Sequence, residues 1–175
     1  KNLAPVGGRS LVGRAVAVGR EAGLTVLLST DDAEIRAEGI EHGAIAPFMR
    51  PAHLATDEAS TVAVLQHAVQ WFETETGGQI VTVVALQPTS PLRTAGDVLE
   101  ALNSFGRRPA GSRSLISLST AGHLSLGILY QPGSHAPIHI ADPARTSRHE
   151  TQQLLIRNGA VYITERDLLM KEGRV

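Results

Sequence analysis

The loop Gln87–Arg93 (QPTSPLR) concentrates hydrogen-bonding side chains between two prolines. The prolines fix their own φ and restrict the residues before them, so the loop is preorganised. Gln87 can both donate and accept, which suits recognition of a sugar hydroxyl or the edge of a base. A proline-stiffened turn, with Thr89 and Ser90 capping the next helix, is the structural alternative. The residue pattern alone leaves both interpretations open.

The elements around this loop alternate between apolar strands and amphipathic helices. This alternation predicts parallel strands joined by right-handed crossovers, and therefore a mainly parallel sheet. In such a sheet ligands bind at the carboxyl ends of the strands, where this loop, Thr30-Asp31 and the segment before Lys1 would lie. The predicted strands are 24–30, 44–49, 80–87, 114–119 and 154–164. The predicted helices are 11–22, one that Asp31-Asp32 caps and that runs through Ile40, 59–75, 94–105 and one that starts at residue 165.

The bulk composition excludes several classes of protein. Sixteen Lys and Arg against 17 Asp and Glu leave a net charge of −1, which predicts no nucleic-acid partner. No apolar run approaches the ~20 residues of a membrane helix, so no membrane partner is expected. Without cysteine, disulfides and thiolate metal sites are excluded, and a cytoplasmic location is compatible.

A length of 175 residues suits one domain. We expect a nucleotide-binding α/β core over residues 1–118, then a dimerisation arm or lid over residues 119–153, where Gly, Pro, His and Ser are frequent. Residues 154–175 would return to the core. The chain begins at Lys1-Asn2 without Met and stops after a predicted helix, so we expect both ends to be truncated.

Four motifs occur in order along the chain: STD at 29–31, RPAHLATDEAST at 50–61, LQPTSPLRT at 86–94 and NGAVYIT at 158–164. With KN at 1–2 and GGRSLV at 7–12, they resemble the acylneuraminate cytidylyltransferases, the CMP-sialic acid synthetases and their relatives. The resemblance implies a three-layer α/β/α nucleotidyltransferase-type domain with a small dimerisation arm. It also implies a homodimer in sugar-nucleotide biosynthesis that joins CTP to a 2-keto sugar acid and releases pyrophosphate.

The resemblance implies a nucleotide-binding set, and each member also has a structural reading. A terminal Lys-Asn could be a frayed tail, Arg50 a strand terminus and Ser60 a residue at a helix N-terminus. Arg93 is expected to support the loop, and Asp31 to cap its helix. The nucleotide-binding residues implied are Lys1, Asn2, Arg50, Ser60, Gln87, Thr89 and Ser90.

For the sugar acid, the resemblance implies Gln87, Arg148, Asn158 and Tyr162. A guanidinium fork is the natural bidentate partner of a carboxylate, although Arg148 could be an ordinary surface arginine and Tyr162 a packed core residue. The chain departs from the family at His149, where the family has Gln. Two further departures are Arg157, where it has Pro, and His123-Leu124-Ser125, where it has His-Pro. All three lie in the sugar-acid half.

The cofactor implied is Mg²⁺ or Mn²⁺. No protein nucleophile is required, and the family's metal-binding aspartates would lie beyond Val175. The function predicted is cytidylyl transfer from CTP to a sialic-acid-like 2-keto sugar acid. Two alternatives remain open: transfer to a different acid acceptor, such as a sialic-acid analogue or a phosphonate, and a non-catalytic nucleotide-binding relative.

Overall fold

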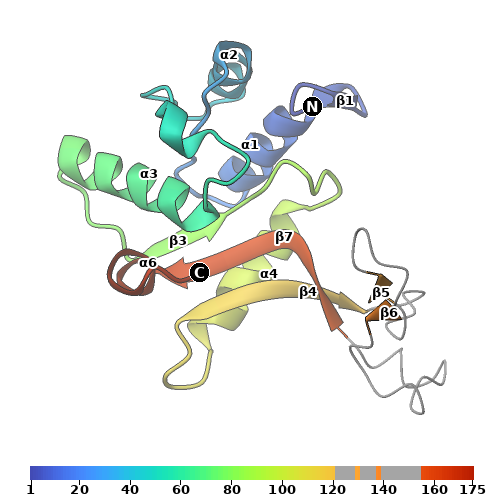
Figure 1. Cartoon of the computed structure of the whole chain (residues 1–175), viewed down its shortest axis with the longest axis vertical. Helices are drawn as coiled ribbons and strands as arrows, with labels where there is room; N and C mark the ends of the chain where they lie inside the picture. The colour runs from blue at the N-terminus through green and yellow to red at the C-terminus, as the bar shows by residue number, and fades with distance from the viewer. Residues whose placement is uncertain (121–128, 131–136, 139–154) are drawn as a thin grey trace. The chain divides into compact units, whose positions relative to one another are not determined.

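A computed structural model describes residues 1–120, 129–130, 137–138 and 155–175 of the chain (Figure 1). The chain divides into two compact units, one of residues 1–117 with 159–175 and the other of residues 118–158. The predicted mixed α/β character is confirmed. The helices are α1 (Leu11–Glu21), α2 (Ala33–Glu41), the short 3₁₀ helix η1 (Ala52–Leu54), α3 (Thr61–Thr76), α4 (Ala95–Gly106) and α6 (Arg166–Glu172).

Polar side chains cap the helices at the positions where the sequence predicts helix starts. Ser10 accepts from the Gly13 N–H at the start of α1, and Thr94 forms a reciprocal capping box with Asp97 at the start of α4. The expectation that Asp31 caps the second helix is wrong. The cap of α2 is Asp32, whose carboxylate accepts from the N–H groups of Glu34 and Ile35.

The strands are β1 (Pro5–Val6), β2 (Arg9–Ser10), β3 (Thr82–Ala85), β4 (Ser114–Thr120), β5 (Leu129–Tyr130), β6 (Pro137–Ile138) and β7 (Leu155–Glu165). The three-stranded sheet has the order β3-β7-β4. β3 and β7 are antiparallel, with Thr82 opposite Glu165 and Ala85 opposite Tyr162. The expected mainly parallel sheet is therefore not confirmed, because the chain returns along β7 next to β3 in the opposite direction.

Parallel pairing is described at one place, the bridge between Leu27 and Ile45. It lies between the two segments predicted as strands 24–30 and 44–49. The Leu28 N–H donates to the Ile45 carbonyl (2.8 Å), and the Ile45 N–H donates to the Val26 carbonyl (2.9 Å). The two segments thus lie side by side, as the alternation predicted, but pair over only a short stretch.

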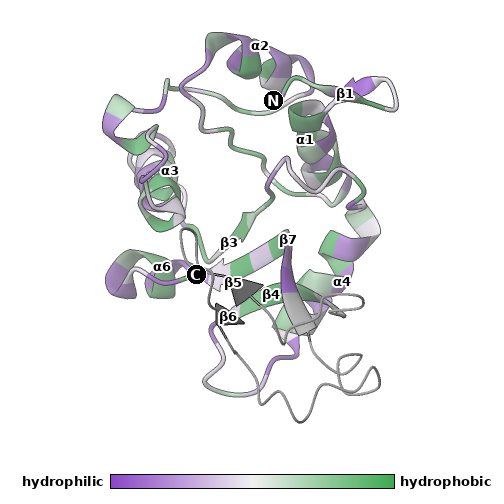
Figure 2. Cartoon of the chain, turned by 45° about the vertical axis from the view of Figure 1, so that its right-hand side comes forward, coloured by the Kyte–Doolittle hydropathy of each residue, from purple (hydrophilic) through white to green (hydrophobic). Residues whose placement is uncertain are grey.

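Two apolar clusters hold the larger unit together. Val98 and Phe105 of α4 pack against Val161 and Ile163 of β7, and α4 passes behind β4 and β7 in Figure 1. Val12 and Val16 of α1 pack against the extended segments through partners that include Ala44, Val26 and Leu28. Figure 2 shows green and purple patches along α4, the pattern of a helix with one buried face.

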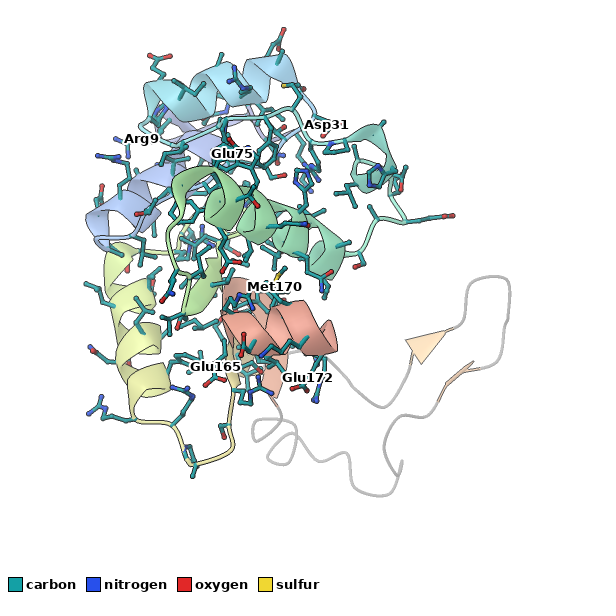
Figure 3. All side chains as sticks on the ribbon, turned by 90° about the vertical axis from the view of Figure 1, so that its left-hand side faces the viewer. Arg9, Asp31, Glu75, Glu165, Met170 and Glu172 are labelled. Carbon is teal, nitrogen blue, oxygen red and sulfur yellow. The ribbon has the colours of Figure 1, made fainter. Side chains whose placement is uncertain are left out.

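Ion pairs attach the C-terminal helix α6 to the rest of its unit. Arg166 donates to Glu73 of α3 through two nitrogens (3.0 and 2.8 Å). Glu165, which precedes α6, accepts from Arg108 and Arg113, and Arg113 also pairs with Glu172. Figure 3 labels Glu165, which directly precedes α6, and Glu172, the last residue of α6. The pKa of Glu165 is held below its ordinary value by the hydrogen bonds from Arg113 and Arg108.

Most of the predicted arm, and Arg148 with it, lies outside the described residues. No helix in the described part of the chain is long and apolar enough to cross a membrane.

Candidate functional site

A cavity of about 310 Å³ lies between the segment 24–30, β3 and the helices α1 and α3. Apolar side chains form most of its wall. A group of its polar residues lies where the segment 24–30 and β3 end: Asn2, Ser29, Thr30, Arg50 and Gln87. Asn2, Arg50 and Gln87 belong to the nucleotide-binding set implied by the resemblance. The structure therefore brings together residues that are far apart in the sequence.

Backbone carbonyls and one carboxylate hold the Arg50 guanidinium in place. Its Nη2 donates to the Ser29 carbonyl (3.2 Å) and lies 3.4 Å from the Asp31 carboxylate, while Nη1 donates to the Leu54 carbonyl (3.4 Å). Asp31 orients Arg50 instead of capping α2. A guanidinium held at both ends has little conformational freedom left to lose on binding a ligand.

Two buried polar atoms among the cavity-lining residues have no hydrogen-bond partner among the described residues: the Ser29 hydroxyl oxygen and the Arg50 Nε. Buried donors and acceptors are normally satisfied, because leaving one unpaired costs about 1–3 kcal/mol. One hydroxyl and one guanidinium N–H are thus available to a polar ligand in this cavity.

Arg93 supports the loop Gln87–Arg93 through hydrogen bonds to backbone carbonyls, as expected. It is 7% exposed, and its Nη1 donates to the Gln87 carbonyl (3.1 Å) and to the Ala160 carbonyl of β7 (2.6 Å). Burial lowers the pKa of Arg93, partly offset by the nearby charge of Asp97. One cationic side chain therefore ties the Gln87 loop to the middle of β7.

The side chain of Gln87 lies against Gly159 in β7. A Cβ placed on Gly159 would be 3.6 Å from the Gln87 Oε1, and Gly159 has φ +72°, a left-handed conformation that favours glycine. The left-handed backbone, and not a lack of space, therefore favours glycine at position 159. Gln87 thus lines the cavity and has its side-chain oxygen close to Gly159 of β7.

The other described residues of the predicted site are not among those that line this cavity. Lys1 and Thr89 are exposed, and Tyr162 is half-buried in β7 opposite Ala85. Ser60 is the N-cap of α3, accepting from the Ala63 N–H, so its structural reading is correct whatever its role toward a nucleotide. Thr94, and not Thr89 or Ser90, caps α4. Asn158 belongs to the smaller unit, where its amide donates to the Ser119 hydroxyl (2.9 Å).

Sequence reasoning missed Ser29 as a cavity residue. The STD motif at 29–31 pointed to the right loop, but no pattern indicated which hydroxyl would be buried without a partner. For the metal, no group of three or more His, Asp or Glu side chains gathers among the described residues. The described residues therefore supply no complete metal site by themselves.

The chain is similar in sequence to several known proteins. Post-translational flagellin modification protein B of Campylobacter coli is 26% identical over 86% of this chain and 63% of its own length. Pseudaminic acid cytidylyltransferase of Campylobacter jejuni is 32% identical over 60% of this chain and 46% of its own length. N-acylneuraminate cytidylyltransferase of Streptococcus agalactiae is 25% identical over 98% of this chain and 41% of its own length. The chain thus spans roughly half the length of these relatives. No protein-family model matches it.

Among solved structures, CMP:2-keto-3-deoxy-manno-octonic acid synthetase in complex with CTP superposes with a TM-score of 0.65, at 19% identity, over 99% of this chain and 70% of that chain. The chain therefore has the mixed α/β fold of that synthetase. With two kinds of cytidylyltransferase among the relatives, the resemblance drawn from the motifs is confirmed. The chain is similar to pseudaminic acid and N-acylneuraminate cytidylyltransferases.

Proposed function

We propose that the full-length protein transfers a cytidylyl group from CTP to the anomeric hydroxyl of a sialic-acid-like 2-keto sugar acid. The hydroxyl oxygen would form a new bond to the α-phosphorus, the bond to the bridging oxygen of the β-phosphate would break, and pyrophosphate would leave with the electron pair. The hydroxyl proton would pass to solvent. The observation that carries this proposal is the cavity that gathers Asn2, Arg50 and Gln87.

The described residues supply positioning and hydrogen bonds. Asn2 and Arg50 would bind the cytidine, with the free Ser29 hydroxyl and Arg50 Nε available to its polar atoms. Gln87 would lie between the nucleotide and the sugar acid, because it lines the cavity and its side-chain oxygen is close to Gly159 of β7. Phosphoryl-type transfer depends mainly on positioning and charge stabilisation, and this arrangement supplies the positioning. A Mg²⁺ or Mn²⁺ ion and a homodimer completed by the arm are parts of the proposal that rest on the resemblance alone.

A second acceptor, pseudaminic acid, has support of its own. The relative named for that acid is 32% identical over its matched region, against 25% for the relative named for N-acylneuraminate. The departures at His149 and Arg157 also lie in the half implied to bind the acceptor. A bacterial sialic-acid analogue is therefore the competing substrate.

Pyrophosphate release by the full-length protein tests the proposal. The protein would be incubated with Mg²⁺, with each of CTP, UTP, ATP and GTP, and with N-acetylneuraminic acid, pseudaminic acid or 2-keto-3-deoxy-octonic acid in turn. Release that requires both CTP and one sugar acid supports the proposal, and the acid that works identifies the acceptor. CTP binding by calorimetry without release under any condition would indicate a nucleotide-binding relative without this activity. The absence of both would contradict the proposed function.

A further inference from the structure

The loop Ser29–Asp31 holds Arg50 through three consecutive residues. The Ser29 carbonyl accepts from the Arg50 Nη2 (3.2 Å), and the Thr30 carbonyl accepts from the Arg50 backbone N–H (2.8 Å). Asp31 is labelled in Figure 3, and its carboxylate lies 3.4 Å from the same Nη2. One short loop therefore fixes both the backbone and the guanidinium of an arginine that lies 21 positions beyond Ser29.

Asp31 supplies the charged partner in this arrangement. Among the described residues it is the one carboxylate within ion-pair distance of Arg50, whereas Ser29 and Leu54 contribute neutral carbonyls. Its carboxylate is free for this role because the neighbouring Asp32 caps α2. The Asp31 side chain is 51% exposed, so water screens the ion pair and its contribution to stability is small. The contact matters more for where the guanidinium points.

The partners of Arg50 leave one of its nitrogens for a ligand. Both terminal nitrogens have partners within the described part of the chain, whereas the buried Nε has none there. Arg50 lines the cavity of about 310 Å³, and Asp31 is not among the lining residues. A ligand in this cavity would therefore meet Arg50, and Asp31 would act on that ligand through Arg50.

A fixed N–H donor distinguishes the two pyrimidine bases. The ring of cytosine has hydrogen-bond acceptors at O2 and N3, whereas uracil carries a hydrogen on N3. A buried donor directed at N3 pairs with cytosine but is left unpaired by uracil, and an unpaired buried donor is costly. A guanidinium that was free to turn could offer another nitrogen to either base. The discrimination therefore depends on how firmly the guanidinium is held.

We propose that Asp31 is a positioning residue for the nucleotide, a role that rests on the proposed function. It orients the Arg50 guanidinium so that Nε faces the base, and it thereby contributes to the preference for CTP over UTP. The two adjacent aspartates then have separate tasks, since Asp31 acts on the nucleotide site and Asp32 on the start of α2.

Calorimetry of the full-length protein with CTP and with UTP compares the two aspartates. Asp31→Ala should raise the Kd of CTP about three- to fivefold, the effect of losing a partly exposed charged partner, and should bring the Kd values of CTP and UTP closer together. Asp31→Glu keeps the carboxylate and should restore part of the difference. Asp32→Ala is the matched control, because it removes the cap of α2 and should lower Tm without changing the Kd of CTP.

A second measurement needs no nucleotide. The ¹⁵N NMR signal of the Arg50 Nε–H is recorded without CTP and is assigned by its absence from Arg50→Lys. This signal should shift or broaden in Asp31→Ala and stay unchanged in Asp32→Ala. An unchanged signal in Asp31→Ala would show that the carboxylate does not orient Arg50, and would overturn the proposed role.

The affinities separate this role from the proposed function. If wild type binds CTP and Asp31→Ala keeps the same preference for CTP over UTP, the positioning role is wrong and the proposed function stands. Equal losses of CTP affinity in Asp31→Ala and Asp32→Ala would also contradict a separate task for Asp31. A wild-type protein that binds no CTP would overturn both proposals.

Discussion

Replacement of Arg93 tests whether one buried cation holds the Gln87 loop against β7. Arg93→Met keeps much of the side-chain volume but removes both hydrogen bonds, to the carbonyls of Gln87 and Ala160. Hydrogen bonds from a charged donor contribute about 1.5–3 kcal/mol each, and two carbonyls would lose a donor. Removing a buried charge regains part of its desolvation cost, which is the cause of the lowered pKa of Arg93.

The expected net loss in the free energy of unfolding is about 2–4 kcal/mol. For a chain of this size, 1 kcal/mol corresponds to about 2–4 °C in Tm, so Tm should fall by about 4–16 °C. Arg93→Lys should recover roughly half of the loss, because an ammonium keeps the charge but lacks the planar fork. Arg107→Ala is the control, since Arg107 is exposed and its Nε makes one long contact, to the Asn103 carbonyl (3.4 Å).

Thermal unfolding by circular dichroism gives the stability of each variant, and pyrophosphate release gives its activity. Arg93 is a positioning residue, so its loss should also lower kcat/KM for CTP by at least about tenfold through displacement of Gln87. A Tm change no larger than that of Arg107→Ala would refute the structural reasoning. A large fall in Tm with unchanged kcat/KM in the folded fraction would show that the loop position does not matter for turnover.

Three other substitutions address the site and the C-terminal helix. Gln87→Ala should lower activity by at least about tenfold and leave Tm within about 2 °C of wild type. Gln70→Ala is the matched control, because Gln70 is an exposed residue of α3. A large loss of Tm with normal kinetics would mean that Gln87 has a structural role. Arg148→Ala should raise the KM of the sugar acid at least about tenfold and leave CTP affinity unchanged by calorimetry; the reverse pattern would contradict its implied role. Because the folded pKa of Glu165 is depressed, its ion pairs stabilise the protein above its unfolded pKa of about 4.3 and are lost as pH falls through the folded value. Glu165→Gln should therefore flatten the fall of Tm between about pH 5 and 3, and an unchanged pH profile would show that these pairs contribute little.

Local signals in the sequence determined most of the helices and the position of the unusual loop. Gly23 follows α1 with φ +76°, and Thr94 caps α4, so these boundaries lie within a residue or two of the prediction. Cap and stop residues act on their own helix, and no distant contact is needed to predict them. The motif order likewise identified the relatives, because it depends on residue types alone.

Choices between equivalent neighbours required the tertiary structure. Asp31 and Asp32 are equally good caps, and Asp32 takes that role while Asp31 lies beside Arg50, a residue from a later segment. Arg93 was expected to support its loop, but its second acceptor, Ala160, is 67 residues away and could not be inferred locally.

Strand pairing shows the same division. Apolar runs predicted the strands, yet they did not predict that β7 lies antiparallel beside β3. The residue types in a strand indicate which of its faces are buried. The choice of neighbouring strand and its direction depends on backbone hydrogen bonds, which every residue type can form. Burial and capping could therefore be predicted from the sequence, while the cavity formed by Asn2, Ser29, Arg50 and Gln87 was decided by the folded chain.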